Sequence, residues 1–299
     1  MLAQSGANFA SPSASGMLTK RFIEKAVERA SIARGVSIWW ADRKAAAWRR
    51  RNPGKPFSDY YADHVRRHLD AGKPHPTLGS QGFTGEVGSK VNWDRVNFAE
   101  RGRNAWREYR DAGIEPGMRC VDYGCGSLRV GQHAIRFFDR GNYWGIDVSA
   151  SFIEDGRNLV DPALIEDKRP RLSPISDELI ELIAVWEPQF IFSHTVIQHV
   201  PEAELPVYFQ RLATMMGPGC KAVIEYIASP RTKRLKAMSW AYADDLLRAA
   251  AAAVDPTLDI RFEPVPERKG KVMKKPRRVM IIERAQMLSV REARVRLTG

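Results

Sequence analysis

The stretch Val121-Asp122-Tyr123-Gly124-Cys125-Gly126-Ser127-Leu128-Arg129-Val130-Gly131, followed by Tyr143-Trp144-Gly145-Ile146-Asp147, decides the fold of this chain. An apolar run leads into a Gly-x-Gly turn, a helical pattern follows, and a second apolar run ends in an acid about twenty residues later. Nucleoside-binding β-α-β units have this order. Their glycines let the backbone approach the ligand closely, and the acid accepts hydrogen bonds from the ribose hydroxyls. The stretch therefore predicts a nucleoside site in an α/β sheet.

The glycine spacing distinguishes two classes of ligand. Dinucleotide sites favour Gly-x-Gly-x-x-Gly, because the pyrophosphate lies on the helix N-terminus and the third glycine allows close helix packing. Arg129 stands at the third glycine position here. Asp122, two residues before Gly124, would repel a pyrophosphate but could accept a hydrogen bond from an ammonium. A nicotinamide-dependent oxidoreductase is therefore disfavoured.

The run apolar-Asp-x-Gly-x-Gly resembles the first motif of class I S-adenosylmethionine-dependent methyltransferases. The resemblance covers residues 90–285 and implies a Rossmann-like, doubly wound, mostly parallel seven-stranded sheet that a terminal antiparallel pair closes. It also implies S-adenosylmethionine as the cofactor. By this resemblance Asp122, Gly124 and Gly126 line the methionine end, and Asp147 holds the ribose. A helix-capping role for Asp147 is the alternative, although Ser149 can serve as that cap equally well.

Apolar runs and helical patterns alternate after Asp147, as a doubly wound sheet requires. The strand at residues 171–175 is weak, because Pro174 is poorly tolerated in a central strand. The predicted strands are 118–123, 143–147, 171–175, 189–193, 221–227, 258–265 and 278–283, and the predicted helices between them are 149–159, 177–186, 202–216 and about 235–253.

The sequence predicts three parts: an N-terminal arm and helical extension at residues 1–89, the cofactor domain at 90–285, and a basic tail at 286–299. We expect residues 1–18 to be disordered and helices at about 19–51, 58–69 and 93–112. Trp39, Trp40 and Trp48 lie among basic residues, which could contact a membrane surface or a nucleic-acid backbone. We favour packing of a helical subdomain. Residues 81–93 form a possible lid, in which Phe83 or Trp93 could pack on the cofactor.

Net charge is +12 and is unevenly distributed. Residues 1–110 carry 20 Lys/Arg against 10 Asp/Glu, residues 111–230 carry 10 against 17, and residues 231–299 carry 17 against 8. The basic flanks suggest an anionic partner, although solvated helix faces explain them equally well. No apolar run is long enough for a membrane span, and the first twenty residues do not resemble a signal peptide. The three cysteines give neither a metal-ligand spacing nor a disulfide framework, which suits a reducing cytoplasm.

The ends of the third and fourth strands supply the remaining candidates. Asp177 could contact the adenine amino group or begin a helix. The run 193–201, Ser-His-Thr-Val-Ile-Gln-His-Val-Pro, resembles a segment of many small-molecule methyltransferases and differs from the Asn/Asp-Pro-Pro-Tyr segment of amide and base N-methyltransferases. Ser193 is a candidate cofactor contact. His194 is the candidate general base, and His199, more often a structural histidine, ranks below it.

The expected function is methyl transfer from S-adenosylmethionine to a small or medium-sized acceptor, through an oxygen. The basic flanks favour an anionic or sugar-containing acceptor. Two alternatives stay open at this point. An RNA methyltransferase would use the basic arm for backbone contacts, and a non-catalytic protein would keep the fold without turnover.

Overall fold

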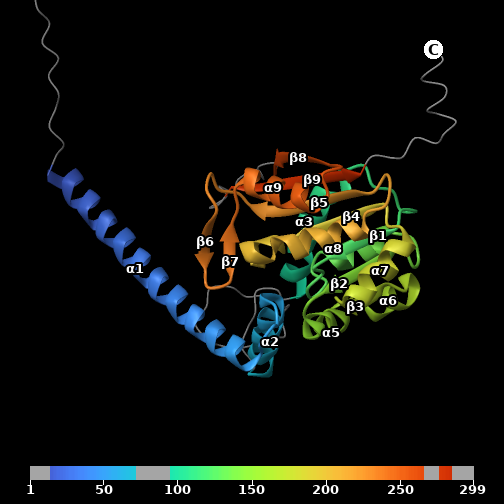
Figure 1. Ribbon diagram of the computed structural model, residues 1–299, viewed down its shortest axis with the longest axis horizontal. Helices are drawn as coiled ribbons and strands as arrows, with labels where there is room; N and C mark the ends of the chain where they lie inside the picture. The colour runs from blue at the N-terminus through green and yellow to red at the C-terminus, as the bar shows by residue number, and fades with distance from the viewer. Residues whose placement is uncertain (1–13, 72–94, 266–275, 285–299) are drawn as a thin grey trace, which may run out of the picture. The chain divides into compact units, whose positions relative to one another are not determined.

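A computed structural model describes residues 14–71, 95–265 and 276–284. The chain divides into two compact units, residues 1–51 and 52–299. The first unit contains helix α1, Ala14–Arg51, which is coloured blue in Figure 1. This helix begins inside the segment for which we expected disorder. The predicted lid at residues 81–93 lies outside the described residues, as do Phe83, Trp93 and the basic tail.

Helix α1 exposes several large apolar side chains among its basic residues. Trp39 and Trp40 are 51% and 54% exposed, and the exposed Val36 and Ile32 lie one and two turns before them. The Arg43 guanidinium lies 4.9 Å from the centre of the Trp39 ring. Trp48 is buried. The expectation that these tryptophans pack a helical subdomain stays a prediction. No helix among the described residues is long and apolar enough to cross a bilayer.

The second unit is built on a seven-stranded sheet of order β3-β2-β1-β4-β5-β9-β8. Strands β1 to β5 are parallel to one another, and β9 is antiparallel to both β5 and β8, so the closing antiparallel pair is confirmed. The strands are β1 Cys120–Tyr123, β2 Tyr143–Asp147, β3 Arg171–Pro174, β4 Phe190–His194, β5 Lys221–Ile227, β8 Leu258–Pro264 and β9 Arg277–Arg284.

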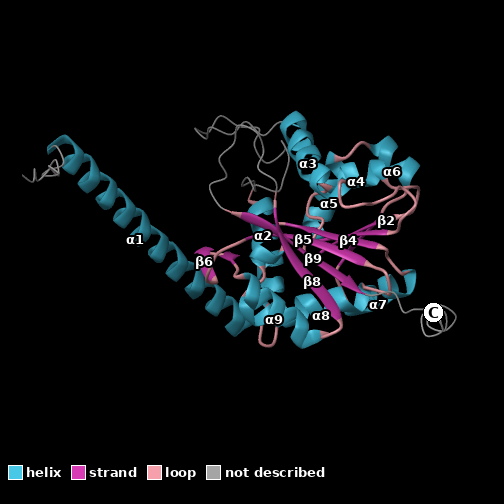
Figure 2. Cartoon of the chain, turned by 90° about the horizontal axis from the view of Figure 1, so that it is seen from above, coloured by secondary structure: helices cyan, strands magenta, loops and turns pink. Residues whose placement is uncertain are grey.

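Helices cover both faces of this sheet, as the alternating pattern predicts. Figure 2 shows α3, α4, α5 and α6 on one side and α7, α8 and α9 on the other. The helices of this unit are α2 Phe57–Asp70, α3 Arg95–Arg110, α4 Gly131–Phe137, α5 Ala150–Leu159, α6 Pro162–Lys168, α7 Asp177–Trp186, α8 Leu205–Met215 and α9 Asp244–Val254. Short 3-10 turns at Ile197–His199 and Glu202–Glu204 connect β4 to α8.

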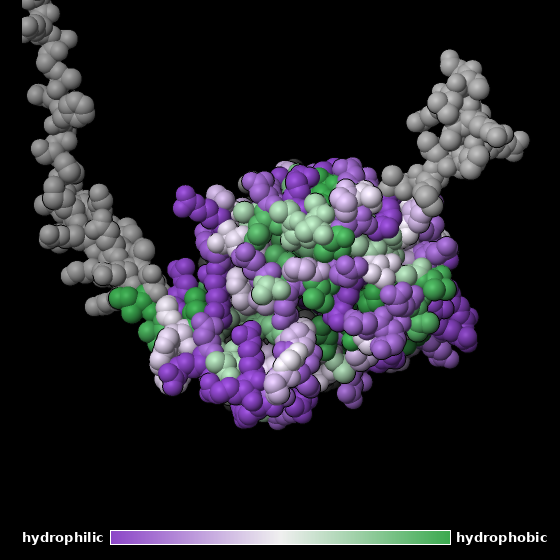
Figure 3. Space-filling view, viewed as in Figure 1, coloured by the Kyte–Doolittle hydropathy of each residue, from purple (hydrophilic) through white to green (hydrophobic). Residues whose placement is uncertain are grey.

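The core lies on the two faces of the sheet. Along β1, Val121 and Tyr123 join one buried cluster, whereas Cys120 joins the other. Central strands that are buried on both faces read as continuous apolar runs, which explains why the strand signal at 190–192 is so clear. On the face seen in Figure 3, hydrophobic residues lie in patches among hydrophilic ones.

Among the strands that the structure describes, β3 pairs with β2 alone and is an edge of the sheet. Proline has no N–H to donate and is tolerated at an edge, where one side of the strand has no partner. The sheet order therefore accounts for Pro174 in a strand that the sequence predicts only weakly.

The predicted helix at 235–253 is wrong in its first half. Residues 233–241 form a two-stranded hairpin of β6, Lys233–Lys236, and β7, Ser239–Ala241. The edge-on ring contact between Trp240 and Phe57, 5.6 Å between centroids, holds the hairpin against α2. Asp244 and Asp245 occupy the first turn of α9, where acidic side chains favour the positive end of the helix dipole. Asp244 and Asp245 therefore mark the true start of this helix, which the apolar periodicity placed too early, at about residue 235.

Candidate cofactor and active site

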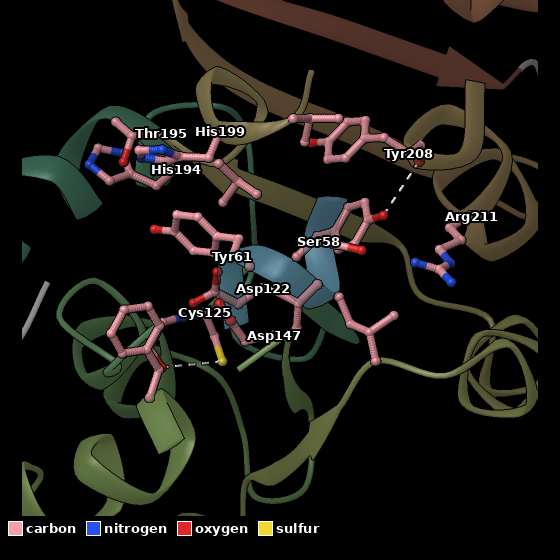
Figure 4. Close-up of a pocket in the computed structure, with 18 of the residues that line it drawn as sticks. Ser58, Tyr61, Asp122, Cys125, Asp147, His194, Thr195, His199, Tyr208 and Arg211 are labelled. Carbon is pink, nitrogen blue, oxygen red and sulfur yellow. Dashed lines mark hydrogen bonds between the residues drawn. The ribbon is translucent and has the colours of Figure 1, made fainter. Parts of the chain in front are cut away.

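A pocket opens at the carboxyl ends of β1, β2 and β4, the edge at which open α/β sheets bind ligands. Helix α2 contributes Pro56, Ser58 and Tyr61 to its lining. Figure 4 shows His194, Thr195 and His199 at one end, Tyr208 and Arg211 at the other, and Asp147 below Tyr61. The pocket therefore joins the glycine turn to the segment after β4.

The glycine turn follows β1 and lines the pocket through Gly124, Cys125 and Gly126. Gly124 has a φ of +89°, and a Cβ there would lie 2.2 Å from Cγ2 of Val196, so a side chain has no room at this position. The Gly126 N–H donates to Oδ2 of Asp147 at 2.9 Å. The turn and the end of β2 are thereby fixed to each other.

Asp147 ends β2 with its carboxylate buried and on the pocket wall. Oδ1 accepts the Ser149 N–H at 2.9 Å. Ser149 itself caps α5, since its Oγ accepts the Phe152 N–H at 3.3 Å. Burial raises the pKa of Asp147 to about 6, although these backbone N–H groups act to lower it. The position suits a carboxylate that accepts hydrogen bonds from ligand hydroxyls.

Asp122 is buried in β1 and lines the same pocket. Tyr143 donates its hydroxyl to Oδ2 at 2.7 Å. Burial raises the pKa of Asp122 to about 8, and the Tyr143 hydrogen bond opposes this shift only in part. A Cβ on Gly131 would lie 2.3 Å from the Tyr143 hydroxyl and 3.2 Å from Oδ2 of Asp122. Gly131 therefore allows α4 to begin against this pair.

Helix α2 forms a wall of the pocket that the sequence did not reveal. The Phe57 and Ser58 N–H groups both donate to the Glu204 carboxylate, which satisfies two of the free donors at the start of the helix. Val65 packs against Phe152, and the Tyr61 ring lies 5.3 Å from the ring of His199. Burial raises the pKa of Tyr61 beyond its ordinary range. The sequence predicts the helix, but no pattern in it predicts the contact between Phe57 and Glu204, which are 147 residues apart.

The end of β4 and the segment that follows it carry the two candidate histidines, and both line the pocket. His194 is the last residue of β4, with its Nδ1 3.0 Å from Oε2 of Glu225 and 3.1 Å from the Tyr109 hydroxyl. Thr195, with a φ of +60°, then turns the chain.

His199 is held through both of its ring nitrogens. Nδ1 donates to the Met238 carbonyl at 2.6 Å, and Nε2 lies 3.1 Å from Nε2 of Gln198. Burial lowers its pKa. These contacts favour a structural role for His199.

Two predicted cofactor contacts do not reach the pocket lining. The Asp177 side chain is 82% exposed and pairs with Arg211, while Ser176 caps α7 through the Leu179 N–H. The helix-start alternative thus describes this segment, and Ile175 is the lining residue after β3. Ser193 is fully buried, donates to the Tyr123 carbonyl and accepts from Tyr208. Alternation along β4 turns Ser193 toward α8 and away from the face of His194.

Three further residues line the pocket that the sequence motifs do not predict as site residues. Val148 and Ile175 place apolar atoms beside Asp147, and Arg129 adds a cation beside the glycine turn. The apolar Val148 and Ile175 suit an adenine, and Arg129 suits a carboxylate. Asp122 suits an ammonium, and Asp147 suits a ribose. That donor set fits a nucleoside joined to an amino acid, because it includes a carboxyl where a pyrophosphate would need cations.

The fold and this pocket define a nucleoside-cofactor enzyme of the Rossmann-like α/β class. Residues 98–249, about half of the chain, match a family model described as a methyltransferase domain. The chain belongs to this family: it is an S-adenosylmethionine-dependent methyltransferase.

Solved structures share the fold at low sequence identity. The [4+2]-cyclase SpnF is 10% identical over 79% of this chain and 99% of its own, with a TM-score of 0.54. Magnesium protoporphyrin IX methyltransferase from Synechocystis PCC 6803, with bound SAH, is 15% identical over 77% and 98%, with a TM-score of 0.49. The glycopeptide N-methyltransferase MtfA with S-adenosylmethionine is 12% identical over 61% and 94%, with a TM-score of 0.47. No curated protein matches the sequence.

Proposed function

We propose that this enzyme methylates a hydroxyl oxygen of a small or medium-sized molecule, with His194 as the general base. The observation that carries the proposal is the placement of the His194 imidazole. It lies on the pocket wall at the end of β4, and a carboxylate lies 3.0 Å from its Nδ1. An imidazole titrates near neutral pH and can accept a hydroxyl proton.

The cofactor assignments rest on the lining residues. Asp147 accepts hydrogen bonds from the two ribose hydroxyls, and Asp122 pairs with the ammonium. Gly124 and Gly126 allow the backbone to lie close to the methionine portion of the cofactor. Arg129 is proposed for the cofactor carboxylate. Asp177 and Ser193 are left out of this set, because their side chains are engaged away from the lining.

The bound cofactor supplies a methyl group on a sulfonium, which is already a good electrophile. Held by Asp122 and Asp147, the cofactor would give its methyl group to the acceptor oxygen and leave as S-adenosylhomocysteine, while Nε2 of His194 would take the hydroxyl proton. Alignment of the two bound reactants contributes the larger part of the rate, and proton removal by His194 adds about 10² to 10⁴. Tyr61 and the rest of α2 exclude water from the cofactor side.

An anionic or sugar-containing acceptor is the substrate class that we propose. Support comes from the hairpin β6–β7, which lies next to the pocket wall, because the Met238 carbonyl accepts a hydrogen bond from the lining residue His199. The hairpin carries Lys233, Arg234 and Lys236, and α2 contributes Ser58 to the same pocket. The N-terminal extension would thus help to select the acceptor.

Three buried, free cysteines suit our proposal of a reducing cytoplasm.

The test is an acceptor panel in which each anionic hydroxyl compound has a neutral analogue, with amines and RNA oligonucleotides included. Production of S-adenosylhomocysteine and the mass of the product are measured for the wild-type protein and for His194→Asn. We expect O-methylated products, a preference for anionic acceptors that weakens with salt, and a large loss of turnover in the variant. Methylation of amines alone, or full turnover by His194→Asn, would contradict the proposal. Steeply salt-dependent methylation of RNA would favour the RNA alternative.

A further inference from the structure

A chain of ionisable side chains runs from the pocket into the sheet behind His194. Glu225 is directly opposite His194 in the β4–β5 register, and its side chain is fully buried. Oε2 lies 3.0 Å from Nδ1 of His194, and Arg277, at the start of β9, forms an ion pair with Oε1. Three strands thus bring a histidine, a carboxylate and a guanidinium into line.

Buried carboxylates are costly, because an ion loses its hydration when it leaves water. Among the described residues, the carboxylates that are buried are Asp122, Asp147 and Glu225. The first two line the pocket, and the third touches a histidine that lines it. The distribution of these costly groups therefore points to a role for Glu225 at the same site.

The contact also constrains where His194 carries its proton. An ionised carboxylate can only accept hydrogen bonds, so a neutral imidazole beside it carries the proton on Nδ1. Nε2 then keeps the lone pair that a base requires. The Tyr109 hydroxyl lies 3.1 Å from the same Nδ1, and its ring meets the imidazole edge-on at 5.9 Å. A hydroxyl can accept from Nδ1–H or donate to an unprotonated Nδ1, so Glu225 and Tyr109 together decide the tautomer.

We propose that Glu225 is the positioning residue for His194: paired with Arg277, its carboxylate holds the imidazole in the Nδ1–H tautomer. This inference rests on the proposed function where it takes His194 as the base. The tautomer itself can be measured without any acceptor. Glu225 is not among the residues that line the pocket, so in this proposal it acts only through the histidine.

The test compares wild-type protein with Glu225→Gln, labelled with ¹⁵N in histidine, by long-range ¹H–¹⁵N correlation at about pH 8.5, where an ordinary imidazole is neutral. His194→Asn identifies the signal. We expect Nδ1–H for His194 in the wild type and loss of that preference in Glu225→Gln, because the amide can donate to Nδ1. For an acceptor found in the panel, kcat should fall by up to about 10² to 10⁴, the range that general acid–base catalysis contributes.

Glu283→Gln is the matched control. Glu283 lies in the neighbouring strand β9, pairs with Arg261 at 2.9 Å, and is outside the pocket lining. It should change neither the tautomer nor kcat. If Glu225→Gln does not fold, Glu225→Asp keeps the charge beside Arg277, moves it away from Nδ1, and should weaken the same preference.

An Nε2–H tautomer in the wild type, or an unchanged tautomer in the Glu225 variants, would overturn the proposal. A panel without turnover would sink the proposed function and leave the tautomer comparison to decide the role of Glu225. If the tautomer changes and kcat does not, the positioning role is also overturned, since the histidine would then not act as the base.

Discussion

Asp122 has a carboxyl group at a position where burial opposes ionisation. Its pKa of about 8 lies above the ordinary value, so its protonated form stabilises the free protein. That contribution is complete below about pH 4 and is lost as pH rises toward 8. We expect the free energy of unfolding to fall across this range and the fall to be smaller in Asp122→Asn. Urea titrations at several pH values measure it, and identical slopes in both proteins would contradict the assignment.

The same carboxyl group links cofactor binding to pH. An ammonium beside Asp122 favours the charged carboxylate, so binding of S-adenosylmethionine should release a proton. Affinity should therefore rise by up to about tenfold from pH 6 to 7, where an α-ammonium stays protonated. Calorimetry in buffers of different ionisation enthalpy counts the proton. Asp147 adds to the effect through its pKa of about 6, and Asp122→Asn isolates the share of Asp122.

Packing explains why a glycine stands at position 131, the last residue of the motif. Alanine there would place a methyl group 2.3 Å from the Tyr143 hydroxyl and so disturb its bond to Asp122. We expect Gly131→Ala to destabilise the protein by about 1 to 3 kcal/mol, as overpacking does, and to weaken cofactor binding. In Gly117→Ala, the control, the added methyl group meets an ordinary contact at 3.8 Å. Thermal unfolding measures the stability of both variants, and equal losses in Gly131→Ala and Gly117→Ala would refute the packing argument.

At the scale of elements, α2 depends on a carboxylate from another part of the fold. Glu204→Gln keeps the shape of the side chain but removes the charge that both N–H groups of α2 face. We expect a loss of about 0.5 to 2 kcal/mol in the local stability of α2 and weaker cofactor binding through Tyr61. Hydrogen exchange of the α2 amides measures it. Glu202→Gln, an exposed neighbour in the same turn, should have no such effect, and unchanged α2 exchange in Glu204→Gln would contradict the capping role.

The sequence predicted elements well wherever a local pattern sets them. The glycine turn, the buried runs of β1, β2 and β4 and the limits of α7 all follow from periodicity and capping residues. The hairpin at 233–241 could not be predicted in this way, because a ring contact with Phe57 stabilises it and no local pattern does. The site divides similarly. Asp122 and Asp147 belong to local motifs, whereas Tyr61 and Glu225 reach the site through contacts between distant segments.

At the scale of the whole molecule, the pocket belongs to the second unit. All of its lining residues come from residues 52–299, and none comes from α1. Trp39→Ala/Trp40→Ala should therefore leave the affinity for S-adenosylmethionine within about twofold and the melting temperature nearly unchanged, since substitutions of exposed side chains have small effects. Calorimetry and thermal unfolding measure both. A large loss of cofactor affinity would show that α1 takes part in the site.

The central claim is that Asp147 holds the cofactor in this pocket, and one titration tests it most directly. Wild-type protein and Asp147→Ala are titrated with S-adenosylmethionine and, separately, with NAD. We predict binding of S-adenosylmethionine alone, weakened at least about tenfold in the variant, because hydrogen bonds to a carboxylate contribute about 1.5 to 3 kcal/mol each. Circular dichroism establishes that the variant is folded. Equal affinity of the folded variant and the wild type, or binding of NAD in place of S-adenosylmethionine, would contradict the account.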